Sequence, residues 1–478
     1  MAMSDDIWRW TATRIATAIR GRDISAREAL ESCLGRMAAV NAKLNAVTVD
    51  LSTNAREAAD RADRAVAKGD ELGALHGVPV TIKENVDQQG SATTNGVVGF
   101  QNVVAREDSP IVANWKRAGA VILGRTNTPA FSFRLDTVND LRGRTYSPWS
   151  KTHTPGGSSG GAASSVAAGI TPLAHGNDIA GSVRFPAFCC GLAGIRPSFG
   201  RVPAYNPTQT AERSMSSQLM SVQGPLARSV ADVRLGLAAM AERDPRDPWW
   251  TPAPLDGPAL QPPIRVAVVT EARDLAGVKL HPSVTRALEQ AAAALADAGY
   301  EIVDVRTPGF TRAKELWFEM QMPEFRHYTL PLIEKEGDDG IRTAVRFMFD
   351  NIPLSSQATE ALSYMKSLSE RTRLIREWTL FLDRVPLVLT PICSEPVYEQ
   401  GFDIESAART ASLWRECATM MAIPVLGLPA IAVPTGMVDG LPMGVQIVGP
   451  RFREDLCLAA AEAIEARRGV LTPIDPAW

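Results

Sequence analysis

The sequence is poor in the residues that bind metal ions or form disulfides. It has five histidines in 478 residues, and no two of them share the i, i+4 spacing of a helical metal-binding pair. Its six cysteines include no C-x-x-C pair. This pattern predicts that no metal ion is bound, and that the cysteines are free, buried thiols in a reducing compartment.

The sequence also lacks an excess of one charge. Lys plus Arg number 50 and Asp plus Glu number 53, which gives a net charge of −3. No basic field is available to attract nucleic acid or an anionic membrane. The N-terminus has no apolar core of the signal-peptide type, and the charge-free segments Thr152–Asn177 and Cys417–Val438 contain too much Gly, Ser or Pro for membrane helices. We therefore expect a cytoplasmic protein with neither a nucleic-acid nor a membrane partner.

Apolar runs typical of buried strands alternate with helical periodicity along most of the chain. The first 70 residues are predicted to be helical, and Ser25 and Glu28 have capping-box spacing there. Alternating helices and strands predict an α/β fold, with a sheet covered by helices on both faces. The predicted strands are Val78–Ile82, Ala118–Leu123, Ile264–Val269, Tyr300–Val305, Pro386–Leu389 and Ala430–Val433, and Pro282–Ala298 is a predicted helix.

Three short motifs carry the polar residues with the clearest chemical potential. Gly77–Asn85 ends an apolar run at Lys83, Pro155–Gly161 reads PGGSSGG, and Asn177–Pro186 contains Ser182 between Asp178 and Arg184. The second motif lies in a charge-free segment of small residues, which indicates a tightly packed helix rather than a flexible linker. Two charged side chains in an apolar region need polar partners, so the third motif predicts a buried polar site.

Together these motifs resemble the amidase signature family. The spacing of Lys83, Ser158 and Ser182 fits the family, and so do the segments Gly119–Asn127 and Gly440–Gly449. The resemblance implies a mixed, mainly parallel sheet in a single domain over residues 1–478. Within it we expect a helical N-terminal segment (about 1–70) and a variable helical insertion (about 307–385) near the active site.

The resemblance also implies how the reaction is catalysed. Ser182 is expected to attack the amide carbonyl, while Ser158, presented by a cis Gly157–Ser158 peptide bond, passes the proton to Lys83. Lys83 must be neutral for this, and burial disfavours its ammonium form. No cofactor is expected. Water and a small amide are the expected substrates, and a homodimer is a possible assembly.

The loop before Ser182 is expected to form the oxyanion hole. The donors would be the backbone N–H groups of Ile179, Ala180, Gly181 and Ser182. Ala180 stands where the family usually has glycine, which leaves the set of donors open. Three further residues are expected to support the site without touching the substrate, namely Asp178, Arg184 and Ser159.

Aromatic and methionine side chains predict an apolar substrate pocket. Phe131 and Phe133 alternate at the period of a strand, and the insertion supplies Trp317 and Met320. These residues favour aryl or other apolar amides, with carbamates (urethanes) and esters also open.

Three alternatives remain at this stage. An α/β-hydrolase would use G-x-S-x-G at Gly156–Gly160, but its triad order needs a late histidine and none follows His327. A non-catalytic anion-binding module could use a glycine-rich loop, although no GxxxxGK[ST] or GxGxxG motif is present. The amidase subunit of a tRNA-dependent transamidase is the third.

Overall fold

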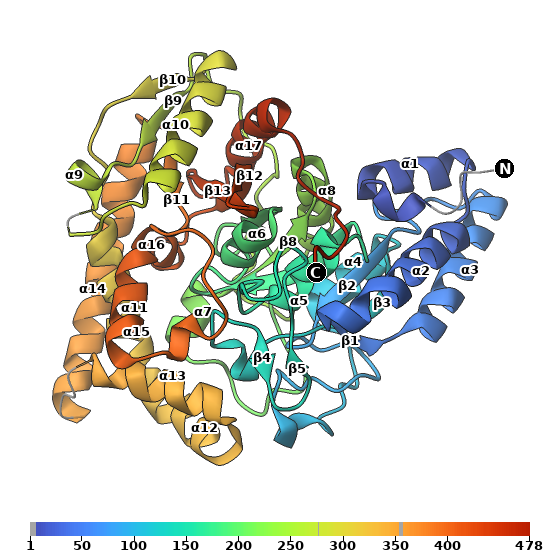
Figure 1. Ribbon diagram of the computed structural model, residues 1–478, viewed down its shortest axis with the longest axis horizontal. Helices are drawn as coiled ribbons and strands as arrows, with labels where there is room; N and C mark the ends of the chain where they lie inside the picture. The colour runs from blue at the N-terminus through green and yellow to red at the C-terminus, as the bar shows by residue number, and fades with distance from the viewer. Residues whose placement is uncertain (1–5, 276, 353–356) are drawn as a thin grey trace.

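A computed structural model describes residues 6–275, 277–352 and 357–478 of the chain. Eleven strands form one sheet, in which neighbouring strands are often distant in the sequence (Figure 1). In spatial order the strands are β1 (Val47–Asp50), β3 (Val121–Thr126), β2 (Pro79–Lys83), β6 (Leu173–Asp178), β8 (Val222–Ala227), β7 (Ala193–Arg196), β12 (Ala430–Val438), β13 (Leu441–Val448), β11 (Leu387–Pro391), β9 (Arg265–Val268) and β10 (Glu301–Val303).

The sheet is mixed, as predicted. Parallel pairing occurs in two groups, β3–β2–β6 on one side and β11–β9–β10 on the other. The strands between these groups pair antiparallel, and so does β1 at the edge. Within this eleven-stranded sheet six of the ten pairings are antiparallel, so parallel pairing is confined to these two groups.

Helices cover the sheet, which confirms the predicted α/β class. Every residue of β2, β3, β8 and β11 is buried. Since successive strand residues point to opposite faces, both faces of these strands must be covered. The covering helices are α1 (Ala12–Gly21), α2 (Ala26–Leu44), α3 (Ser52–Lys68), α4 (Pro110–Arg117), α5 (Gly160–Ala167), α6 (Arg184–Cys190), α8 (Val230–Met240), α10 (Pro282–Asp297) and α17 (Glu454–Arg468).

A second group of helices, drawn in yellow-orange to red-orange in Figure 1, lies to one side of the sheet. Helix α11 packs against both α14 and α16, and α13 packs against α15. Their bounds are α11 (Phe310–Glu324), α12 (Leu330–Glu336), α13 (Asp339–Asp350), α14 (Gln357–Leu382), α15 (Ala407–Glu416) and α16 (Ala418–Leu426). In the part of the chain that the structure covers, no helix is long and apolar enough to cross a membrane.

Local sequence signals agree with most of these elements. The Ser25–Glu28 capping box forms at the start of α2, and α10 begins at Pro282 as predicted. The prediction that the first 70 residues are helical is wrong for Val47–Asp50, which forms the edge strand β1. Only four residues long, this strand is too short to show a clear period of its own.

Candidate active site

Lys83, Ser158 and Ser182 come together where the parallel strands β2 and β6 end. Lys83 is the last residue of β2, and β6, the parallel neighbour of β2, leads into the loop that carries Ser182. Ser158 follows a cis Gly157–Ser158 peptide bond, as expected, just before α5. Parallel strands end at the same edge of a sheet, so the topology brings the three motifs together. Ser158 and Ser182 line one cavity of 250 Å³.

The Lys83 amine lies within hydrogen-bond distance of three oxygens. Its Nζ is 2.7 Å from Ser158 Oγ, 3.1 Å from Ser159 Oγ and 2.8 Å from Asn177 Oδ1. The Asn177 amide oxygen can only accept, so the amine donates there, whereas a serine hydroxyl can donate to the lone pair of a neutral amine. The arrangement therefore suits a lysine that accepts a proton from Ser158.

Burial disfavours the protonated, ammonium form of Lys83. The side chain is fully buried, and this burial lowers the pKa of Lys83 well below 10.5, an effect that the charge of Asp178 only partly opposes. Its amide partner Asn177 carries no charge, so it does not stabilise the ammonium form as a carboxylate would. The lysine is thus suited to act as a base.

Asn177 is a site residue that the motif analysis did not assign. Its Oδ1 accepts from Lys83, and its Nδ2 donates to Asn85 Oδ1 at 2.9 Å. The residue stands directly before Asp178 at the start of the third motif, and only the fold shows that Asn177 faces Lys83.

His175 lies close to Lys83 but is placed as a structural group. Its Nδ1 accepts from the Lys83 backbone N–H at 3.4 Å, and its Nε2 lies 2.8 Å from Gln223 Oε1. Burial lowers the pKa of His175 to about 3, so the ring is neutral at ordinary pH. Both ring nitrogens are thus engaged away from the serines.

Asp178 holds the loop before Ser182 in place. Its carboxylate accepts from the backbone N–H groups of Gly181 at 2.9 Å and Val183 at 3.3 Å. Arg184 donates to it twice, at 3.0 Å each, and Arg196 donates to its carbonyl oxygen at 2.6 Å. Burial acts to raise the pKa of Asp178, but the two arginines and these hydrogen bonds outweigh it and lower the pKa to about 2.

The same contacts correct the predicted oxyanion hole. The Gly181 N–H donates to Asp178, so it does not point at a reacting carbonyl. The sequence does not show this hydrogen bond, because the contact between the Asp178 carboxylate and the Gly181 N–H depends on how the loop folds. The N–H groups of Ile179, Ala180 and Ser182 remain as candidate donors.

Two side chains from the outer helices contact this loop. Trp317 on α11 donates from Nε1 to the Ile179 carbonyl oxygen at 2.8 Å. Gly181 has φ of +110°, and a Cβ there would overlap Met420 of α16. The loop is therefore fixed both by polar contacts and by close packing.

Sequence comparison identifies the family of this chain. A family model for amidases matches residues 28–458. Indoleacetamide hydrolase from Bradyrhizobium diazoefficiens is 46% identical over 466 residues, which are 97% of this chain and 88% of that protein. The chain belongs to the amidase signature family. It is an amidase. This family assignment excludes the α/β-hydrolase and the non-catalytic anion-binding module.

Other relatives match nearly the whole length of the amidase. One subunit of the glutamyl-tRNA(Gln) amidotransferase from Deinococcus radiodurans is 32% identical, over 95% of this chain and 97% of that one. The solved structure of 6-aminohexanoate cyclic dimer hydrolase superimposes with a TM-score of 0.80 at 28% identity, and the match covers 99% of both chains.

The amidase has two cavities that meet at Ser182. The first, which we call the polar arm, has a volume of 250 Å³ and is lined by residues that include Asn85, Ser158, Asn177, Asn206, Gln209 and Arg213. The second, the apolar arm, has a volume of 170 Å³ and is lined by residues that include Phe131, Phe133, Trp317, Met322, Phe325 and Trp414. Ser182 lines both arms, whereas Ser158 lines only the polar arm.

Of the four residues predicted to form the substrate pocket, three line the apolar arm and one does not. Phe131, Phe133 and Trp317 line it, but Met320 is buried in the core and does not. Gln321, which follows Trp317 by one helical turn, faces the arm in its place. The strand argument for Phe131 is also wrong, because this residue lies in a 3₁₀ turn with φ of +57°.

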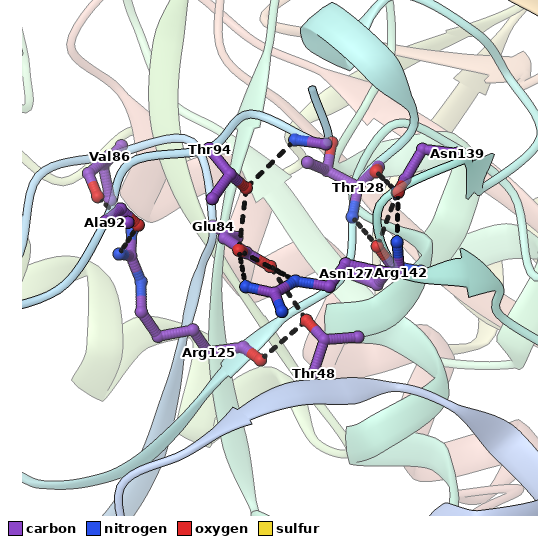
Figure 2. Close-up of polar contacts among 11 residues, drawn as sticks. Thr48, Glu84, Val86, Ala92, Thr94, Arg125, Asn127, Thr128, Asn139 and Arg142 are labelled. Atoms are coloured by element: carbon purple, nitrogen blue, oxygen red, sulfur yellow. Dashed lines mark hydrogen bonds and ion pairs between the residues drawn. The ribbon is translucent and has the colours of Figure 1, made fainter. Parts of the chain in front are cut away.

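A buried polar network supports the chain directly after Lys83 (Figure 2). Glu84 accepts from Arg142 at 2.6 Å, from Thr94 Oγ1 at 2.7 Å and from Thr48 Oγ1 at 2.9 Å. These contacts tie the end of β2 to the edge strand β1 and to the loop that carries Arg142. Within the described residues, no group of three His, Cys, Asp or Glu side chains could hold a metal ion.

Proposed function

We propose that the amidase hydrolyses small aryl amides, of the arylacetamide type, through an acyl-enzyme at Ser182. The observation that carries this proposal is the aromatic-lined apolar arm that opens onto Ser182. The 46% identity to an indoleacetamide hydrolase supports the same substrate class.

In this mechanism Ser182 Oγ attacks the amide carbonyl as its proton passes to Ser158, whose own proton moves to neutral Lys83. The tetrahedral intermediate collapses when Ser158 returns a proton to the leaving nitrogen and the C–N bond breaks. Water then repeats the sequence on the ester, which releases the acid and restores Ser182. The 2.7 Å contact between Lys83 and Ser158 supports the relay.

The developing oxyanion would be held by backbone N–H groups of the loop before Ser182. One such donor typically contributes about 3 kcal/mol to the transition state. Asp178, Arg184 and Ser159 act indirectly in this proposal, because the first two fix the loop and the third contacts Lys83.

The apolar arm would select the acyl group. Burying apolar area contributes roughly 25 cal/mol per Å², so a substrate ring enclosed by aromatic side chains should be preferred over a methyl group by about one to two orders of magnitude in kcat/KM. Carbamates and aryl esters present the same acyl geometry and are secondary candidates.

The similarity to an amidotransferase subunit supports a second candidate, glutamine hydrolysis for transamidation. The aromatic lining of the apolar arm is less suited to the polar glutamine side chain than to a ring.

The test is kcat/KM for indole-3-acetamide, phenylacetamide, acetamide and glutamine. We expect the two aryl amides to exceed acetamide by about 10- to 100-fold. Phe325→Ala should reduce this preference, because Phe325 lines the apolar arm and packs on Phe133, with 4.9 Å between the ring centroids. Tyr328→Ala is a matched control, since Tyr328 is 61% exposed on the same helical segment. A preference for glutamine would contradict the proposal.

A further inference from the structure

The polar arm contains a cation that has no partner within the protein. Arg213 lines this arm, and it is the one charged side chain among the described lining residues. In the part of the chain that the structure describes, its guanidinium makes no hydrogen bond and no ion pair; the single hydrogen bond at this residue is accepted by its backbone oxygen from Gln218.

The acidic groups that act on the charge of Arg213 form no ion pair with it. These groups are Asp247 and Glu212, which attract the guanidinium only from a distance. The two carboxylate oxygens of Asp247 already accept the backbone N–H groups of Ala204 at 2.7 Å and Trp249 at 2.8 Å. Burial lowers the pKa of Arg213, since the protonated form loses water contacts without gaining a counter-ion. An anionic ligand would supply the missing partner.

The position of Ser158 indicates which part of a substrate enters the polar arm. Ser158 is the group that would return a proton to the leaving nitrogen, and it lines the polar arm but not the apolar arm. If the apolar arm holds the acyl group, the substituent on the nitrogen extends into the polar arm. This step rests on the proposed function.

The polar arm is also larger than a primary amide requires. Its volume is 250 Å³, whereas the leaving group of a primary amide is ammonia. Beyond Ser158 it is lined by hydrogen-bonding side chains, among them Asn206, Gln209 and Ser221. A polar leaving group the size of an amino acid fits this volume and this chemistry.

We propose that the amidase also cleaves aryl-acyl conjugates of amino acids, with Arg213 binding the carboxylate of the leaving amino acid. The acyl carbon would be transferred from nitrogen to Ser182 Oγ, and the amino acid would leave with the proton returned by Ser158. Water then hydrolyses the ester, so that one conjugate and one water give one aryl acid and one amino acid. An arginine can bind a carboxylate through two parallel hydrogen bonds, which would orient the scissile amide.

The experiment compares N-(indole-3-acetyl)glycine and N-(indole-3-acetyl)aspartate with the neutral N-(indole-3-acetyl)glycinamide and with indole-3-acetamide. In the wild type, kcat/KM for the anionic conjugates should exceed that for the neutral conjugate. The ratio should fall by about tenfold or more in Arg213→Gln, reverse in Arg213→Glu and be partly retained in Arg213→Lys. Arg234→Gln is the control, because Arg234 pairs with Glu462 and Asp256 and does not line the arm.

The outcomes separate this inference from the proposed function. Hydrolysis of indole-3-acetamide without hydrolysis of any conjugate, or an anionic-to-neutral ratio that Arg213→Glu leaves unchanged in a folded variant, overturns the role of Arg213 alone. Failure of every aryl amide, including the primary amide, overturns the proposed function as well. Thermal unfolding of each variant shows whether it is folded.

Discussion

At the scale of single residues, Lys83 determines how activity should depend on pH. Its pKa is lowered by burial, so the neutral base persists at pH values where an exposed lysine is protonated. Activity should therefore be lost as the pH falls through this lowered pKa. Lys83→Arg and Lys83→Met should both lose about 10²- to 10⁴-fold in kcat, because neither side chain can accept the proton. Comparable pH profiles for Lys83→Arg and wild type would exclude the base role.

Lys83 should also affect stability in a direction that can be measured. The folded protein binds fewer protons than the unfolded chain between the lowered pKa and 10.5. Stability therefore rises with pH across this window, by at most about 1.4 kcal/mol per pH unit. Denaturant unfolding of Lys83→Met should lack this rise. An identical slope in the two proteins would show that Lys83 is charged when folded.

Asp178 should contribute to stability as well as to the shape of the loop. Asp178→Asn removes the charge that pairs with buried Arg184. Losing one partner of a buried ion pair lowers the free energy of unfolding by about 3–5 kcal/mol. The carboxylate's contribution is fully present above its unfolded pKa of 3.8, and is lost as the pH falls through about 2. Urea unfolding at neutral pH tests this. A change below about 0.5 kcal/mol would mean that Arg184 finds another partner.

The candidate triad could be predicted at this scale because its residues occur in three short motifs with characteristic spacing. Asn177 and the Gly181 N–H could not be assigned in the same way. Their roles depend on which groups face each other across β2, β6 and the loop, and this geometry is created only when the strands pair. Met320 was misplaced for a similar reason, since one residue along a helix turns a side chain by about 100°.

At the scale of elements, helix α11 contacts both the apolar arm and the loop before Ser182. Trp317 both lines the apolar arm and donates to the Ile179 carbonyl at 2.8 Å. A peptide unit is planar, so fixing this carbonyl also fixes the N–H of Ala180, which points the opposite way. The helix therefore contributes to the orientation of one candidate oxyanion donor.

Trp317→Phe keeps an aromatic ring in the arm but removes the indole N–H. We expect kcat to fall by about 3- to 10-fold with a smaller change in KM, because one hydrogen bond contributes about 1 kcal/mol. Steady-state kinetics on an aryl amide provide the measurement, with the exposed Tyr328→Ala variant as the control. A change confined to KM would mean that Trp317 only packs against the substrate.

Most elements with strong periodicity were predictable, including α2, α10 and the buried strand β2. The strands β6, β7 and β8 were not assigned, because glycine, polar residues and proline interrupt their apolar pattern. Burial on both faces and pairing with neighbours stabilise them instead of local propensity. The order of the strands likewise depends on contacts between distant segments.

At the scale of the whole molecule, Ser182 lies between two regions of opposite character. The sheet and its loops supply the polar groups around Ser158, while the outer helices α11 and α15 add Trp317, Gln321, Met322 and Trp414 to the apolar arm. Ser182 lines both arms, so one substrate can place its acyl and leaving groups in different surroundings. With this division, changes in the outer helices can alter the acyl group that is accepted while the sheet keeps the catalytic groups in place.

The central claim is that Ser182 carries the acyl group during turnover. Acid quenching of the enzyme during hydrolysis of an aryl amide or its ester, followed by peptide mapping by mass spectrometry, tests it most directly. We predict the mass of the acyl group on the peptide that contains Ser182, and no such adduct in Ser182→Ala, whose kcat should fall by about 10³-fold or more. An adduct on Ser159 or another serine, with Ser182→Ala still active, would contradict the account.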